Sequence, residues 1–182
     1  MTGPSLFGDL PDGIASRLEL SKPYRGIQIF EGLHRHRLGF SGMTNLPEDL
    51  RSRLERDFSE FATRAGAELS DPDGTVKLRI DLADGAAVEC VLLTDQNGRK
   101  TACLSTQVGC AMGCTFCRTG LLGFRRNLDS AEIVEQFHHL DRARGPVGNI
   151  VFMGMGEPLM NTENLRRSIE IFTHPRGLAL RL

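Results

Sequence analysis

Apolar residues recur at helical spacing in the first third of the chain. The repeat of three or four positions predicts helices over 12–20, 23–36 and 47–61, and the last two begin with a proline, which the first helical turn tolerates. We therefore expect residues 1–66 to form a small helical domain. The other faces of the third helix carry a set of arginines, which form either a solvated surface or a platform for RNA: Arg51, Arg53, Arg56 and Arg64.

The hydrophobic pattern changes to a period of two in the middle of the chain. Residues 75–80 and 87–93 alternate polar and apolar side chains. The dipeptide Asp84-Gly85 between these runs is a turn sequence, so the whole segment is typical of a β-hairpin. We expect this hairpin to form a connector over residues 67–100.

Strand and helix patterns alternate in the last part of the chain. A strand over 101–106 precedes a capping sequence that opens at Asp129 and begins a helix. An apolar run over 149–153 predicts a buried strand, and a helix over 163–172 follows it. Such alternation is typical of a parallel sheet or barrel. The expected fold class is therefore α/β, with the helical domain and hairpin followed by the first strand-helix units of an incomplete barrel over 101–182.

The composition is that of an ordinary globular chain. Its 182 residues are 40% hydrophobic and 25% charged, and the net charge of −1 gives no global attraction to a polyanion. No stretch reaches the roughly 18 apolar residues of a membrane helix, and the N-terminus has no basic flank followed by an apolar run. We expect a cytoplasmic protein without a membrane partner. In that compartment five cysteines favour ligands or chemistry over disulfides.

The candidate chemistry centres on three cysteines in the pattern C-x3-C-x2-C, which are Cys110, Cys114 and Cys117. Glycines beside two of them let a short loop wrap one inorganic centre. An iron-sulfur cluster normally takes four thiolates, so three from the protein leave one iron free to bind a small molecule. The alternative is a zinc site completed by a distant side chain, with His138 and His139 as candidates.

A second stretch of chemical interest follows the last predicted strand and runs from Gly154 to Pro158. Glycines at the end of a barrel strand expose backbone carbonyls, and the adjacent carboxylate of Glu157 can hold an ammonium group. Glycine turns after strands are usually structural, so this stretch alone carries little information. Together with a loop of three thiolates, this stretch suggests a site in which the amino-acid part of a ligand is bound next to the iron that lacks a protein ligand.

Together these stretches resemble the radical S-adenosylmethionine (SAM) enzymes. The wider series of motifs resembles the methyltransferases that modify adenine C2 in ribosomal and transfer RNA, and their C8-methylating antibiotic-resistance relatives. The resemblance covers nearly the whole chain. Its motifs are Lys22 to Arg25, Met43 to Leu46, Ser105 to Cys110, Cys114, Phe116, Cys117, Gly123 to Leu128, and Met153 to Pro158.

The resemblance implies a radical SAM RNA methyltransferase acting on adenine C2 of large-subunit rRNA, with tRNA as a second substrate. It implies that Cys110, Cys114 and Cys117 hold a 4Fe-4S cluster. It also implies that Gly156 and Glu157 help to bind the methionine part of S-adenosylmethionine. In the family, an electron from a donor such as flavodoxin passes through the cluster, the C–S bond of the cofactor breaks, and a 5′-deoxyadenosyl radical forms.

Two further residues receive catalytic roles from the resemblance. Cys103 matches the second family cysteine, which resolves a protein-RNA adduct as a disulfide, and Glu89 aligns with the proton acceptor proposed for the family. Taken without the resemblance, Cys103 is a buried strand thiol and Glu89 is a solvent-facing hairpin residue. Cys90 matches no family ligand and is expected in the core.

The chain also departs from the family pattern. Family members are longer, with further barrel strands that complete the cofactor site and a late cysteine that carries the methyl group, whereas no cysteine follows Cys117 here. We therefore expect a truncated core, and no methyl transfer by this chain alone. The alternatives are an inactive fragment or a remnant that binds an iron-sulfur cluster or RNA, and then a zinc-stabilised nucleic-acid-binding module.

Overall fold

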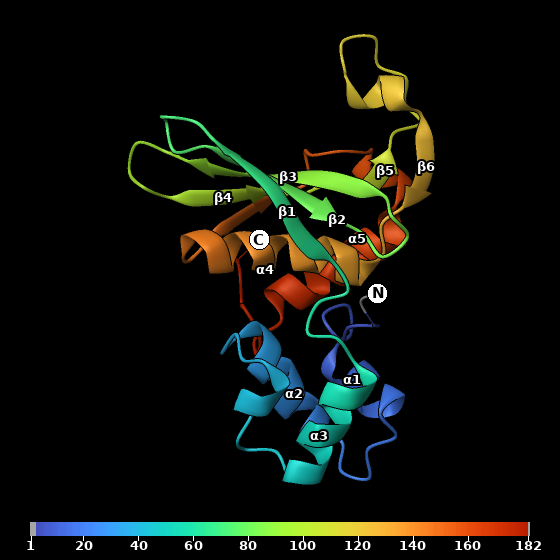
Figure 1. Ribbon diagram of the computed structural model, residues 1–182, viewed down its shortest axis with the longest axis vertical. Coiled ribbons are helices and arrows are strands. Elements are labelled where there is room, and N and C mark those ends of the chain that lie inside the picture. Colours follow the sequence, from blue (N-terminus) through green and yellow to red (C-terminus); the bar gives the residue numbers. More distant parts are fainter. Residues whose placement is uncertain (1–2, 182) are drawn as a thin grey trace.

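The computed structural model describes residues 3–181 (Figure 1). Helices α1 to α3 gather at one end of the molecule, the strands lie at the other end, and α4 lies between them under the sheet (Figure 1). The helices are α1 (Pro11–Arg17), α2 (Tyr24–His34), α3 (Glu48–Asp57), α4 (Ser130–Arg144) and α5 (Thr162–Thr173). The strands are β1 (Arg64–Ser70), β2 (Val76–Asp81), β3 (Ala87–Thr94), β4 (Lys100–Cys103), β5 (Gln107–Gly109), β6 (Phe124–Asn127) and β7 (Asn149–Val151).

Five strands form one sheet in the order β1-β2-β3-β4-β7. Strands β1 to β4 are antiparallel neighbours, whereas β7 lies parallel to β4. A parallel pair needs a crossover, and α4 supplies it, so the expected strand-helix-strand unit is present. Within the described part of the chain the sheet stays open and no barrel closes. The prediction of an α/β fold with an incomplete barrel is confirmed.

The third helix and the strand after it differ from the prediction. Helix α3 ends at Asp57, and Arg64 begins β1 rather than extending a helix face. Every residue of β1 is exposed, so its side chains show no alternation of apolar and polar positions. Pairing with β2 defines this edge strand, and a pattern of hydrophobicity cannot reveal it.

The strand expected over 101–106 is also interrupted. Strand β4 ends at Cys103, and β5 then leaves the main sheet and pairs with β6 as a separate two-stranded ribbon. Neither β5 nor β6 was predicted, because three or four residues are too few to establish a hydrophobic period. This ribbon carries the cysteine-rich loop away from the body of the molecule (Figure 1).

Buried polar groups fix the helical part to α4. The carboxylate of Glu135 is fully buried and accepts a hydrogen bond from the hydroxyl of Ser5. It also accepts from the backbone N–H of Ala62 at 3.0 Å, and from the N–H and hydroxyl of Thr63 at 2.8 and 2.6 Å. Burial raises the pKa of Glu135, while these donors oppose the rise. These four hydrogen bonds to one carboxylate fix the position of the helical part relative to α4.

One apolar core runs through the helical part, the sheet and α4. The division into parts over 1–66, 67–100 and 101–182 stays a prediction, and its second boundary falls between two paired strands, β3 and β4. None of the helices in residues 3–181 combines the length and apolar character needed to cross a membrane.

Candidate functional site

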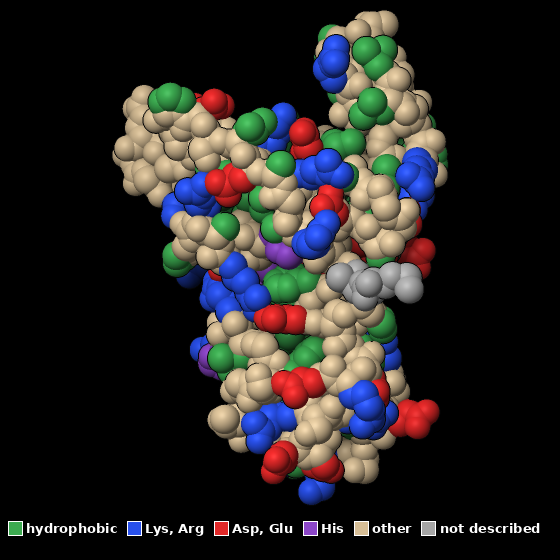
Figure 2. All heavy atoms as spheres, viewed as in Figure 1, with side chains coloured by type: hydrophobic (Ala, Val, Ile, Leu, Met, Phe, Trp, Pro, Cys, Tyr) green, Lys and Arg blue, Asp and Glu red, His purple; other side chains and the backbone are tan. Residues whose placement is uncertain are grey.

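The three clustered cysteines lie on the loop that joins β5 to β6 and projects from the molecule (Figure 1). Their thiols are free; Cys114 is exposed, and Cys110 and Cys117 are half-buried. Large apolar side chains on the same loop face solvent, among them Phe116, which is 90% exposed (Figure 2). The loop is therefore accessible to a ligand from outside.

Two glycines shape the neck of this loop. Gly109 and Gly123 have φ angles of +76° and +69°, in the left-handed region that side chains disfavour. A Cβ atom on Gly109 would lie 1.7 Å from the carbonyl oxygen of Gly123. The backbone N–H of Cys110 donates to that same oxygen at 3.1 Å. Close approach of the two strands requires glycine here, and it brings Cys110 to the base of the loop.

The environment of Cys117 favours its thiolate. The backbone N–H groups of Gly120 and Thr119 lower the pKa of the Cys117 thiol. The thiolate is the form that binds metals. In residues 3–181, no three side chains of Cys, His, Asp or Glu are gathered closely enough to hold a metal ion. The structure thus places three free sulfur donors on one accessible loop, and sulfur donors are the ligands that an iron-sulfur cluster needs. The three thiols are not gathered around one common centre.

The glycine-rich turn lies directly beside the segment that leads into this loop. The backbone N–H of Thr106 donates to the carbonyl oxygen of Met155 at 2.8 Å, and the N–H of Gly154 donates to that of Leu104 at 3.1 Å. The hydroxyl of Ser105 accepts from the N–H of Met155 at 2.8 Å. The structure therefore fixes the glycine-rich turn to the residues just before β5, which lead into the cysteine stretch.

Gln107 joins the turn to the ribbon, and sequence reasoning missed this role. Its side-chain oxygen accepts from the backbone N–H of Glu157 at 2.9 Å. A Cβ atom on Gly156, whose φ is +98°, would lie 2.5 Å from the Cβ of Gln107. One oxygen of the Glu157 carboxylate accepts from the N–H of Leu159 at 3.1 Å, which orients that carboxylate. Gln107 lies within the motif Ser105 to Cys110, but a single sequence does not show what its side chain contacts, because its partners are distant along the chain.

Glu89 and Cys103 lie on the same face of the main sheet. In the β3–β4 register Cys103 is opposite Val91, and Glu89 is two positions before Val91. Glu89 is exposed, and its carboxylate lies 3.3 Å from the ammonium of Lys77. Cys103 is half-buried, and burial raises the pKa of its thiol. Cys90 points to the opposite face, where it is fully buried with a pKa of about 12, so its expected place in the core is confirmed.

The two histidines considered for zinc binding are engaged elsewhere. The Nε2 atom of His138 lies 3.1 Å from the Nδ1 atom of His34, and both rings are buried. The Nε2 atom of His139 lies 3.0 Å from the hydroxyl of Thr63. Burial lowers the pKa of His139 to about 4. Both histidines therefore belong to the contact between α4 and the helical part.

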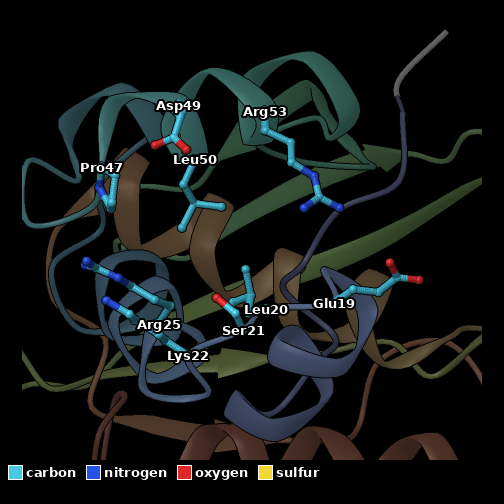
Figure 3. Close-up of a pocket in the computed structure, with 9 residues that line it drawn as sticks. All are labelled: Glu19, Leu20, Ser21, Lys22, Arg25, Pro47, Asp49, Leu50 and Arg53. Atoms are coloured by element: carbon cyan, nitrogen blue, oxygen red, sulfur yellow. The ribbon is translucent and has the colours of Figure 1, made fainter.

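Among the hollows of the surface, two are lined by both cationic and carboxylate side chains and bear on the candidate site. One, of about 500 Å³, lies between the β2–β3 hairpin and the cysteine loop, and Glu89 lines it. The other, of about 340 Å³, lies in the helical part, at the far end of the molecule from the cysteine loop (Figures 1 and 3). Lys22, Arg25 and Arg53 line this second hollow together with Glu19 and Asp49. Its mixed charge gives it no strong preference for an anion.

Comparisons with known proteins cover the part of the chain that carries these residues. The family model described as "Radical SAM superfamily" matches residues 104–178. A "Probable dual-specificity RNA methyltransferase RlmN" of Treponema pallidum subsp. pallidum is 49% identical over 173 residues, which are 95% of this chain and 51% of that protein. The "Dual-specificity RNA methyltransferase RlmN" of Solidesulfovibrio magneticus is 46% identical over 164 residues, covering 86% of this chain and 46% of that protein.

A solved structure agrees as well. The "Crystal Structure of a radical SAM methyltransferase from Sphaerobacter thermophilus" superimposes with a TM-score of 0.87 and 34% identity, and the match covers 97% of this chain and 54% of that one. The fold and the family match together point to the radical SAM superfamily over residues 104–178. Within that superfamily the chain is similar to part of the proteins named RlmN dual-specificity RNA methyltransferases, which confirms the resemblance found in the sequence. The chain spans about half the length of these relatives.

Proposed function

We propose that this chain is the cluster-binding and cofactor-binding part of a radical SAM enzyme that methylates adenine in RNA. The observation that carries the proposal is the contact between the glycine-rich turn and the segment that leads into the thiol loop, at Met155 and Thr106, in a chain whose relatives are named RNA methyltransferases. The proposed substrate is adenine C2 of large-subunit rRNA, with tRNA as a second substrate. A reductant such as flavodoxin would supply the electron.

Cys110, Cys114 and Cys117 would hold the 4Fe-4S cluster, because they are free sulfur donors on one accessible loop. Gly156 and Glu157 would bind the methionine part of S-adenosylmethionine. Gly156 packs directly against Gln107, which fixes the turn, and the oriented carboxylate of Glu157 can accept from an ammonium group. Together the two bound groups would supply the radical chemistry, and these residues would position and shield it.

Glu89 and Cys103 would act on the substrate side. Their common face on the sheet supports a shared role. Glu89 would accept a proton, and its exposed carboxylate, 3.3 Å from the ammonium of Lys77, is open to a substrate. Cys103 would resolve the protein-RNA adduct: its sulfur would attack the sulfur of a methyl-carrying cysteine supplied from outside this chain, and the disulfide would form as the sulfur–carbon bond to the adduct breaks.

Anaerobic reconstitution of the chain with iron and sulfide tests the proposal. About four irons per chain are expected, with an electron paramagnetic resonance signal of the reduced cluster that shifts when S-adenosylmethionine is added. Replacing Cys110, Cys114 and Cys117 together by Ala should abolish iron binding, whereas Cys103→Ala, the matched control, should retain it. Glu157→Ala should retain iron and lose the shift.

Other outcomes would contradict the proposal. One zinc ion bound in place of iron would favour the zinc-stabilised module, and iron retained by the triple variant would place the cluster elsewhere. That this chain alone does not transfer a methyl group stays a prediction, and incubation with an RNA fragment and S-adenosylmethionine checks it.

A further inference from the structure

The hollow between the hairpin and the cysteine loop has a volume of about 500 Å³ and two walls of different origin. Arg79 and Glu89 line it from the sheet, and Arg118 and Leu122 line it from the loop. Met155 of the glycine-rich turn also lines it. A ligand in this hollow would therefore touch the sheet, the loop and the turn at once.

Arg118 supplies a positive charge that the fold leaves uncompensated. It directly follows Cys117 and precedes the short 3-10 turn Thr119–Leu122. Its side chain is exposed and makes no hydrogen bond or ion pair with any residue from 3 to 181. All five N–H donors of this guanidinium are free for a ligand.

Arg79, on the opposite wall, is only partly engaged. Its Nε donates to the carboxylate of Asp81 at 2.7 Å, which leaves both Nη groups free for other acceptors. Arg79 is opposite Glu89 in the β2–β3 register, and Glu89 has its own cation in Lys77 at 3.3 Å. Asp81 and Glu89, the carboxylates near the hollow, are thus each paired with a cation. The positive charge of Arg118 is not balanced by either of them.

Resting on the proposed function, we propose that this hollow binds a phosphodiester group of the RNA substrate between the guanidiniums of Arg79 and Arg118. The planar fork of a guanidinium matches two oxygens of a phosphate, which a lysine cannot do. An enzyme that modifies a base must hold that nucleotide out of the stack. A backbone phosphate held between Glu89 and the cysteine loop would place the adjacent nucleotide beside the candidate chemistry.

The hollow in the helical part offers no comparable site. Two carboxylates, Glu19 and Asp49, line it beside the three cations, and neither forms an ion pair within residues 3–181, so a phosphate there would meet uncompensated like charge (Figure 3). Glu89 in the other hollow is paired with Lys77. The other anion that could occupy the hollow at Arg118 is the carboxylate of S-adenosylmethionine. The test below separates this cofactor from RNA.

The experiment measures binding of the full chain to a fluorescently labelled RNA stem-loop with adenine in the loop, across a range of salt concentrations. Arg79→Ala and Arg118→Ala should each weaken binding about tenfold, because each removes a charge-assisted contact. Each should also lower the slope of log affinity against log salt by about 0.7, the value for one phosphate of a single strand. Arg99→Ala is the matched control, since Arg99 is 73% exposed and pairs with Asp95 inside its own turn at 2.7 Å; it should change neither quantity.

Three results would overturn the proposal. The first is unchanged affinity and slope in both variants, and the second is no RNA binding by the parent chain. The third is loss of S-adenosylmethionine binding, measured by equilibrium dialysis, with RNA binding intact, because the hollow would then hold the cofactor. Iron content measured on the same preparations keeps the outcomes distinguishable. Failure of RNA binding with about four irons retained removes this inference and leaves the cluster assignment standing.

Discussion

The side-chain oxygen of Gln107 accepts a hydrogen bond from the backbone N–H of Glu157 at 2.9 Å. The nitrogen of the same amide donates to the side-chain oxygen of Asn127 on β6 at 2.8 Å. Gln107 is 1% exposed, and its two partner residues are half-buried. One amide therefore fixes the glycine-rich turn relative to the ribbon that carries the cysteines.

Gln107→Ala should lower the free energy of unfolding by about 1–3 kcal/mol, because two half-buried polar partners lose their hydrogen bonds. It should also speed hydrogen exchange at the Glu157 amide, which urea unfolding and exchange mass spectrometry would detect together. Gln96→Ala, in an exposed turn, should change stability by less than about 0.5 kcal/mol. Equal effects of the two substitutions would mean that the Gln107 amide does not hold the turn.

Gly156→Ala should lower the free energy of unfolding by about 2–4 kcal/mol. The substitution combines a strained positive φ of +98° with a Cβ only 2.5 Å from the Cβ of Gln107. Gly148→Ala is the control, because no atom lies within 4 Å of a Cβ built there, and it should cost less than about 1 kcal/mol. Urea midpoints for the two variants check this. Equal stability would show that the turn can relax without cost.

Arg126→Ala should lower the free energy of unfolding by about 1–3 kcal/mol, because Arg126 ties β6 to both α4 and the hairpin. Its guanidinium donates to both carboxylate oxygens of Glu132 at 2.7 and 2.8 Å, and to Asp84 at 2.9 Å. The hydrogen bond from Arg126 lowers the pKa of Asp84 to about 2.

Arg125→Ala is the matched control for Arg126. Its side chain is 61% exposed and reaches Asp84 only at 4.0 Å, so its loss should cost less than about 0.5 kcal/mol. Limited proteolysis of the cysteine loop should accelerate in the Arg126 variant alone. Faster cleavage in both variants would mean that the positive charge of β6, and not the hydrogen bonds of Arg126 to Glu132 and Asp84, protects the loop.

Acid should weaken the contact between α4 and the helical part through His34 and His138. Burial lowers the pKa of His34 to about 3 and lowers that of His138 well below its usual range. Histidines in the unfolded chain have pKa values of about 6.5. Between that pH and the lowered pKa values of the folded protein, the unfolded chain therefore binds more protons. Stability is complete above about pH 6.5 and falls as the pH is lowered, by up to about 1.4 kcal/mol per pH unit for each histidine.

His34→Phe tests this pH dependence, since it removes one titrating group from a ring cluster that already contains Phe7 and Phe30. The variant should be less stable at neutral pH, because His138 loses its partner, yet its stability should fall less steeply between about pH 6.5 and 4. Urea midpoints measured across this range give the two slopes. Identical slopes would rule out His34 as a source of the acid sensitivity.

Features that depend on near neighbours in the chain were predictable. The cap of α4 is as expected: Asp129 accepts from the N–H of Glu132 at 2.8 Å, and Glu132 accepts in return at 3.0 Å. The helical stripes and the β2–β3 alternation also correspond to observed elements. The edge strand β1 and the ribbon strands β5 and β6 were missed, because partners elsewhere in the chain define them.

The sequence by itself determined the spacing of Cys110, Cys114 and Cys117, the cap of α4 and the glycines of the turn, since each depends on residues a few positions apart. Tertiary structure decided that Gln107 meets Glu157, fifty residues away, and that Glu89 shares a sheet face with Cys103. It also decided that His138 is used in packing. Hydrogen bonds and packing form between whatever groups the fold brings within about 3–4 Å, and one sequence does not record these distances.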